Sequence, residues 1–171
     1  MIALTDNQRA EFFRRSYTAL DGLWFMKVEE RYGFEVALEV DNEVWKVVPK
    51  IQARQLKSMA NLGGGIDALL ECFTTKLALE NFKFEVEKGE SGFKVLIKEC
   101  PWHNLMVKSN REELSEKVGT LICNTEGSVW ASEFGEKISF ELKGQICKGE
   151  NFCTLKFTEY CNYDKDGGEP L

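Results

Sequence analysis

Apolar side chains recur at helical spacing through the first part of the chain. The following positions share one helix face: Phe13, Tyr17, Leu20, Trp24 and Val28. Thr5 and Gln8 stand at the spacing of a capping box, and Gly33 is typical of a helix stop. We therefore expect a first helix from about residue 5 to Tyr32.

A second helical pattern begins at about Phe34 and is interrupted by Pro49, which should kink or divide the helix. The pattern resumes as far as Met59. Gly63-Gly64-Gly65 then favours a flexible turn, and no Lys-Ser/Thr follows it at the spacing of a phosphate loop. A further helix is predicted from Ile66 to about Glu80.

The pattern then changes to alternation. Residues 82–87 and 93–97 alternate apolar and polar side chains across a glycine-containing turn, which predicts a hairpin. Ser109 to Glu112 fits another capping box and predicts a helix toward Ile122. The segment 129–134 is compatible with helix or irregular structure.

A second hairpin is predicted from Ile138–Leu142 and Cys153–Thr158, around a turn at residues 148–151. The order is thus helices first and then β-β-α-β-β. Short connections favour an α+β fold, with helices packed on an antiparallel sheet. We expect one domain over 1–171, with a helical part (1–80), an α+β ligand-binding part (81–163) and a frayed tail (164–171).

Composition narrows the classes of function. The formal net charge of -6 argues against nucleic acid and against an anionic membrane surface as partners. No signal peptide and no long apolar span is recognisable, so we expect a cytoplasmic protein. Six cysteines are many for a reducing compartment, where metal binding, a reactive thiol or burial explain them better than disulfides.

The main candidate site combines the only histidine with cysteines of the C-terminal half. Cys100-Pro101-Trp102-His103 places a thiol and an imidazole three positions apart, and Pro101 restricts Cys100 to extended geometry. Cys147 and Cys153 flank the second hairpin's turn, and Cys123 lies near the end of the intervening helix. These five residues predict a metal site, with zinc as the expected ion and iron as the other option.

Two other interpretations of this cluster stay open. The cysteines can be ordinary core residues, because cysteine is among the most buried residue types. Alternatively, Cys100 or Cys147 acts as a thiolate nucleophile with His103 as its base. Cys72 and Cys161 are left out as core or surface thiols.

Carboxylates of the first helices form a second group: Asp21, Glu29, Glu30, Asp41 and Glu43. Asp21 and Asp41 each lie near a tryptophan in the sequence, and burial among aromatic rings would raise their pKa values. A solvated helix face with ion pairs is the interpretation we favour.

Large aromatic side chains form a third group. Trp24, Trp45, Trp102 and Trp130 are expected either to pack in the core or to line an apolar ligand pocket between helices and sheet.

Several segments resemble known proteins. The stretches Ala19–Phe25, Val28–Glu30, Tyr32–Phe34 and Asp41–Trp45, followed by Ile51–Arg54, resemble an uncharacterised prokaryotic group similar to the L-2-amino-thiazoline-4-carboxylic acid hydrolase-like proteins. The ending Cys147–Cys153 with Leu155–Phe157 resembles vinyl-reductase-type small-molecule-binding domains. The resemblance implies a mixed α/β ligand-binding fold and a hydrolase ancestry, and it carries over no catalytic residue.

Three functions follow as hypotheses. The first is a small-molecule-binding or sensing domain with a Cys/His metal site. The second is a cysteine-dependent hydrolase of a small cyclic amide or thiazoline, and the third is a non-catalytic interaction module with structural cysteines. A small-molecule ligand is the expected partner, and a homodimer is a further option.

Overall fold

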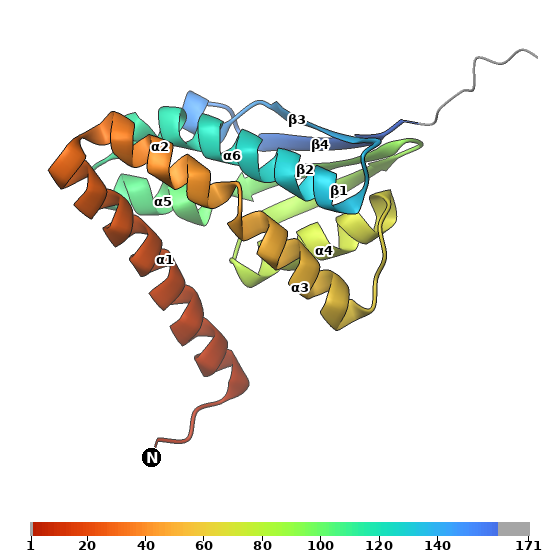
Figure 1. Ribbon diagram of the computed structural model, residues 1–171, viewed down its shortest axis with the longest axis horizontal. Coiled ribbons are helices and arrows are strands. Elements are labelled where there is room, and N and C mark those ends of the chain that lie inside the picture. Colours follow the sequence, from red (N-terminus) through yellow and green to blue (C-terminus); the bar gives the residue numbers. More distant parts are fainter. Residues whose placement is uncertain (1, 161–171) are drawn as a thin grey trace, which may run out of the picture.

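Helices fill the first half of the chain and a sheet dominates the second. The computed structural model describes residues 2–160, so the predicted tail (164–171) and Cys161 lie outside the described residues. The first half forms α1 (Asp6–Tyr32), α2 (Phe34–Trp45), α3 (Val48–Ala60) and α4 (Ile66–Leu79). The second half forms β1 (Lys83–Gly89), β2 (Gly92–Glu99), α5 (Pro101–Lys108), α6 (Glu112–Phe134), β3 (Ile138–Lys143), a short 3₁₀ helix η1 (Ile146–Lys148) and β4 (Cys153–Glu159) (Figure 1).

Local sequence signals set both ends of α1. The predicted capping box is present, because the Gln8 backbone N–H donates to Thr5 Oγ1 (3.2 Å) and the Thr5 N–H donates to Gln8 Oε1 (2.9 Å). Gly33 ends the helix with a φ of +87°, a backbone angle that residues other than glycine rarely adopt. The first helix is therefore as predicted.

Pro49 divides the second helical segment as expected. The chain leaves the helix after Trp45 and resumes at Val48, so Pro49 occupies the first turn of α3. A proline is tolerated there because the first N–H groups of a helix have no intrahelical acceptor. The break at residues 46–47 therefore separates α2 from α3.

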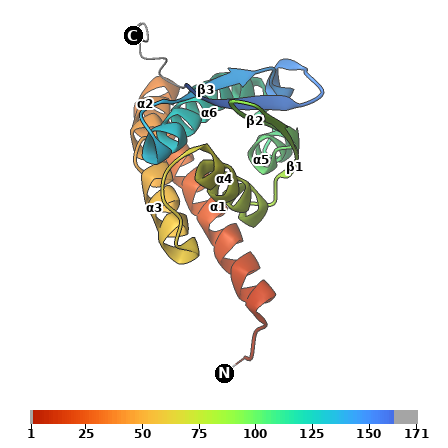
Figure 2. The ribbon, with the colours of Figure 1, turned by 90° about the vertical axis from the view of Figure 1, so that its right-hand side faces the viewer.

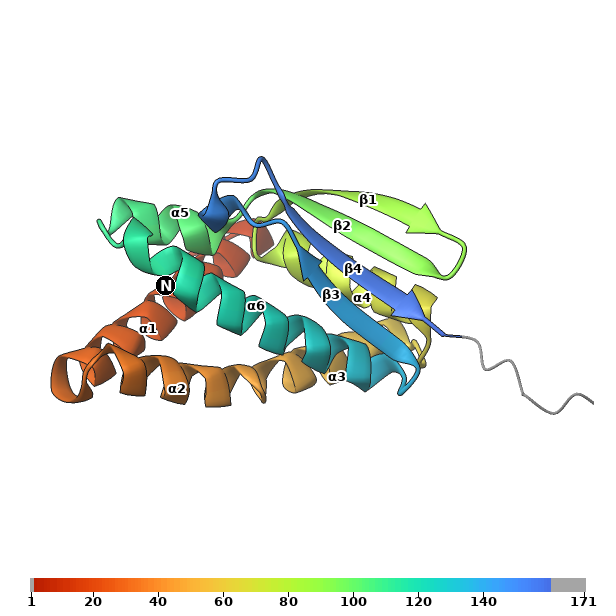
Figure 3. The same cartoon turned by 90° about the horizontal axis from the view of Figure 1, so that it is seen from above.

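The sheet has the strand order β1-β2-β4-β3, and every neighbouring pair is antiparallel. Both predicted hairpins are present, and β4 lies between β2 and β3. Helices α4 and α6 pack on one face of this sheet, as Figure 3 shows from above. The α+β fold with an antiparallel sheet is thus confirmed.

Aromatic rings join the sheet to the helices. The Phe157 ring of β4 lies 5.0 Å, centroid to centroid, from Phe73 of α4 and 5.0 Å from Phe93 of β2. Trp130 of α6 lies 5.4 Å from Phe73. All four side chains are buried, so they form the centre of the hydrophobic core.

The segment around residues 100–112 differs from expectation. Pro101 opens the helix α5, which was not predicted, although Cys100 is extended as expected. Ser109 does not cap the next helix, because its hydroxyl donates to the Leu105 carbonyl (2.8 Å) at the end of α5. Helix α6 begins only at Glu112, after Asn110 has taken a left-handed φ of 55°, and it continues to Phe134.

No helix among residues 2–160 combines the length and apolar character needed to cross a membrane.

Gly92 is expected to be required at the start of β2. A Cβ at this position would lie 2.1 Å from the Phe157 carbonyl oxygen, so Gly92→Ala forces the β2–β4 backbone apart. We expect a loss of about 1–3 kcal/mol in the free energy of unfolding, measured by urea denaturation.

Gly89→Ala is the matched control in the same hairpin. Its added Cβ would lie 3.6 Å from the nearest atom, which is ordinary contact. Equal stability losses in the two variants would contradict a steric role for Gly92.

Candidate functional site

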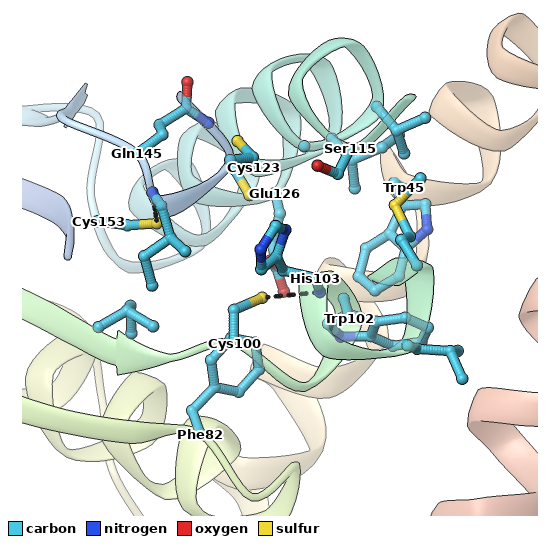
Figure 4. A pocket seen from close by; sticks show the side chains of 18 of the residues that line it. Trp45, Phe82, Cys100, Trp102, His103, Ser115, Cys123, Glu126, Gln145 and Cys153 are labelled. Carbon is cyan, nitrogen blue, oxygen red and sulfur yellow. Dashed lines mark hydrogen bonds between the residues drawn. The ribbon is translucent and has the colours of Figure 1, made fainter. Parts of the chain in front are cut away.

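A cavity of about 200 Å³ lies between the sheet and the helices. Its walls come from α1, α2, α4, α5 and α6, from strands β2–β4 and from η1 (Figure 4). It therefore lies where the helical first half of the chain meets the sheet.

Most of the cavity wall is apolar. On the side of the sheet, Ile97 and Leu155 face Phe73 and Leu77 of α4. On the helical side, Trp102 lies edge-on between two rings, 6.0 Å from Tyr17 and 6.0 Å from Trp45. A wall of this kind favours an apolar ligand over water.

A few polar groups are placed in this wall. His103 of α5 and Ser115 of α6 both line the cavity, and Figure 4 shows the His103 ring between Cys100 and Glu126. The His103 Nδ1 atom is buried and has no hydrogen-bond partner among residues 2–160. Gln145 is held by Thr120, whose hydroxyl donates to Gln145 Oε1 at 2.9 Å. The imidazole nitrogen is thus one group that is left to bond a ligand.

All five residues of the predicted metal site line this same cavity: Cys100, His103, Cys123, Cys147 and Cys153. They come from four elements, because Cys100 precedes α5, Cys123 lies on α6, Cys147 lies on η1 and Cys153 begins β4. The tertiary structure brings to one cavity residues that are up to 53 positions apart in the chain.

Residues that line the same cavity do not necessarily lie close enough together to coordinate a metal ion. Among residues 2–160, no three His, Cys, Asp or Glu side chains are grouped so that they could hold a metal ion. The predicted zinc site has no support in this geometry, and binding of zinc or iron stays a prediction.

The thiols engage backbone groups instead. Cys100 Sγ accepts from the His103 N–H (3.5 Å), so it caps α5, and Cys153 Sγ accepts from the Ile146 N–H (3.2 Å). Burial raises the pKa of Cys100 to about 11, and it also raises the pKa of Cys123, Cys147 and Cys153. These thiols are protonated at neutral pH and act as apolar lining.

The four tryptophans divide between three environments. Trp45 and Trp102 line the cavity, as the ligand-pocket hypothesis expects. Trp130 is fully buried in the core, stacked 6.0 Å from Phe134. Trp24 is 59% exposed, because its position on α1 turns it away from the protein body. Trp24 and Trp130 therefore do not line the cavity, contrary to the prediction that they are part of a ligand pocket.

The carboxylates of the first helices also divide. Glu30 and Glu43 form the expected surface ion pairs, with Lys27 and Lys46, and Glu29 pairs with Arg111 of the α5–α6 connection. Asp21 and Asp41 instead line the cavity. The favoured solvated-face interpretation is wrong for these two.

Their surroundings shift both acids in the same direction. Burial, with the nearby Glu80 charge, raises the pKa of Asp21 to about 6. Burial and the Asp21 charge raise the pKa of Asp41 to about 7, although the Trp45 indole N–H nearby lowers it somewhat. That N–H lies outside hydrogen-bonding geometry and has no partner in the described chain.

A buried lysine lies among further carboxylates near the cavity. Lys76 of α4 is only 3% exposed, and its ammonium lies 2.5 Å from Glu126 Oε1 and 3.0 Å from Glu80 Oε2. Neither carboxylate oxygen has the geometry of a hydrogen bond to the ammonium, so the two contacts are ion pairs. Burial alone would lower the pKa of Lys76, but the two carboxylates outweigh it and raise that pKa. The ammonium is charged at every physiological pH.

Sequence reasoning did not find Lys76, Glu126 or Ser115. One signal was available, because Lys76 interrupts an otherwise apolar face of α4 between Phe73 and Leu77, with Glu80 four residues on. Ser115 and Glu126 carry no such signal.

Lys76→Met should destabilise the protein strongly. It leaves Glu80 and Glu126 buried without their cation, and such losses cost about 3–5 kcal/mol. Lys94→Met is the control, because Lys94 forms an exposed ion pair with Glu87 that is worth at most about 1 kcal/mol. Urea unfolding at neutral pH compares the two, and similar small losses would contradict a structural role for the buried cation.

Asp41→Asn should change how stability depends on pH. In the unfolded chain Asp41 releases its proton near 3.8, but in the folded protein it does so near 7. Between these values the folded state holds more protons, so this group makes stability fall as pH rises. Asn removes that loss. As pH rises from about 4 to about 8, the thermal midpoint of the variant should therefore increase relative to that of the wild type.

A constant difference between the two midpoints across that range would contradict the raised pKa. Glu43→Gln, on the same helix but in an exposed ion pair, is the control and should show no such gain.

No curated protein matches the chain in sequence. Among solved structures, one similar fold is the crystal structure of the phenol-responsive sensory domain of the transcription activator PoxR with phenol. The match covers 93% of this chain and 76% of that chain, with a TM-score of 0.52 and 13% sequence identity. At this identity, the likeness concerns the fold alone.

A family model covers nearly the whole described chain, from residue 8 to residue 164. The comparisons give no support for the expected resemblance to the L-2-amino-thiazoline-4-carboxylic acid hydrolase-like proteins, and the resemblance to vinyl-reductase-type domains stays a prediction. By this match, the chain belongs to the family of unknown function DUF6125.

Proposed function

We propose that the protein is a sensing or ligand-binding domain that holds one small, largely apolar molecule in the cavity. The observation that carries this proposal is an interior space of about 200 Å³ with a mainly apolar wall. An apolar protein cavity of about 150 Å³ stays dry and binds benzene. The volume therefore suits a single substituted aromatic ring.

The polar groups suggest where the ligand carries its substituent. The unpartnered His103 Nδ1 is buried in the wall, and an unsatisfied buried nitrogen costs about 1–3 kcal/mol. A ligand hydroxyl would supply the missing partner while its ring contacts the apolar wall. A simple phenol has this combination.

The structural neighbour supports the same class of function. Its title describes a phenol-responsive sensory domain that was crystallised with phenol. A shared fold does not fix a ligand, so for this chain the argument depends on the cavity and its wall.

The other hypotheses receive less support. A cysteine hydrolase needs a thiol with a lowered pKa beside a base, and here burial raises the pKa of Cys100 and of Cys147. In addition, Cys100 accepts from the backbone N–H of His103 rather than from its ring. A pure interaction module would not need a cavity.

Ser115→Leu tests the proposal by filling the cavity from α6. Ser115 lines the cavity and is 3% exposed, so the larger side chain takes the space of the ligand. We expect phenol or toluene to bind wild type in isothermal titration calorimetry, and the variant to bind about tenfold more weakly or worse. Ser132→Leu makes the same change on the exposed side of α6 and should leave affinity unchanged.

His103→Phe separates the polar contact from the cavity itself. It removes the imidazole nitrogen and keeps a ring, so the affinity for phenol should fall several-fold while that for toluene should not. Absence of binding of both compounds to wild type, or equal binding by Ser115→Leu, would overturn the proposal.

A further inference from the structure

Helix α1 carries an exposed apolar surface that the cavity does not use. Six large side chains on it are between 56% and 69% exposed. One of them, Tyr32, is the last residue of the helix. The other five are Phe12, Phe13, Leu20, Leu23 and Trp24, and we call this set the outer face of α1. Figures 1 and 2 show why it is uncovered, because the N-terminal part of α1 extends away from the rest of the protein as an arm.

The outer face is distinct from the side of α1 that packs on the body. At 3.6 residues per turn, Asp21 and Phe25 lie about 100° and about 140° around the helix from Leu20, and Tyr17 lies between the two sides. Tyr17 contacts Trp102, while Asp21 and Phe25 line the cavity. Helix α1 is thus apolar on two sides, and within residues 2–160 only one of them is covered. A helix of this kind is normally packed between two partners.

The size of the outer face fits self-association. Large aromatic side chains cover about 150–250 Å² each. The outer face has three of them and two leucines, all more than half exposed, so together they present on the order of 600 Å². That is as large as the largest apolar patch of a typical monomer, about 300–600 Å². Two such faces together bury on the order of 1,200 Å², which reaches the lower limit of specific interfaces.

The pattern along the outer face is self-complementary. Phe12 and Phe13 lie toward one end, Leu23 and Trp24 toward the other, and the small Ser16 lies between them. A two-fold axis that relates antiparallel helices places each end against the opposite end of the partner, as an isologous interface requires. A second copy therefore offers the matching surface, whereas the net charge of -6 disfavours an anionic membrane.

We propose that the protein forms a homodimer in which the outer faces of two α1 helices pack antiparallel to each other. This pairing gives the arm of α1 the tertiary contact that an isolated helix needs in water.

Analytical ultracentrifugation of the full chain over a micromolar concentration series tests the dimer. Wild type should move toward twice the chain mass of 19.6 kDa as concentration rises. Leu20→Glu and Trp24→Glu put a charge into the interface on a good helix former, and each should weaken dimerisation about tenfold or more. Met59→Glu is the matched control, because Met59 is 72% exposed on α3, outside the outer face.

Two results of the sedimentation series would overturn the proposal. One is a wild type that stays monomeric at every concentration, and the other is a dimer that persists in both α1 variants. If a variant unfolds, hydrogen exchange of wild type decides, because amides of residues 12–24 should exchange more slowly as dimer forms. Unchanged exchange over the same concentrations would reject the interface. None of these measurements requires a ligand, so the result is independent of the proposed function.

Discussion

The buried ammonium of Lys76 constrains the arrangement of the helices. A charge with 3% exposure is tolerated only beside opposite charges, so Glu80 of α4 and Glu126 of α6 must stay within contact of it. Gln52 of α3 joins the group, since its Nε2 donates to Glu80 Oε1 at 3.3 Å. This network fixes α3, α4 and α6 relative to one another on the sheet, and α4 and α6 are walls of the cavity.

The same network gives the cavity two unlike ends. Lys76 is one cation near several acids, and Asp21 and Asp41 add carboxyl groups from α1 and α2 that this cation does not pair. Burial, together with neighbouring carboxylates, raises the pKa values of both. The end near α1 and α2 is therefore acidic, while Ile97 and Leu155 make the end near the sheet apolar. A ligand with one polar substituent suits such a space better than an ion does.

Helix α1 connects this interior to the surface. Its inner side supplies Asp21 and Phe25 to the cavity, and its outer face carries Leu20 and Trp24 toward solvent or a second copy. One helix therefore carries both surfaces. The cysteines contribute differently, as neutral side chains that fill space in the wall and cap backbone N–H groups.

The sequence by itself determined the elements with strong local signals. The Thr5 capping box, Gly33, Pro49 and the first hairpin act through contacts between near neighbours, so their effects could be predicted without the fold. The α+β class followed from them. Signals that compete locally were misjudged, as when Ser109 bonded back to Leu105 and ended α5 instead of starting α6.

Only the tertiary structure decided the site. Periodicity places Trp24 on an apolar helix face, but it cannot show whether that face contacts the core. In the structure Trp24 lies at the surface, while Trp45 lines the cavity. Likewise, spacing could suggest that Cys100 and Cys153 converge, but not that their sulfurs bond backbone N–H groups. The Lys76 network joins α4 to α6, and which charges end up buried together depends on how the helices pack rather than on their order in the chain.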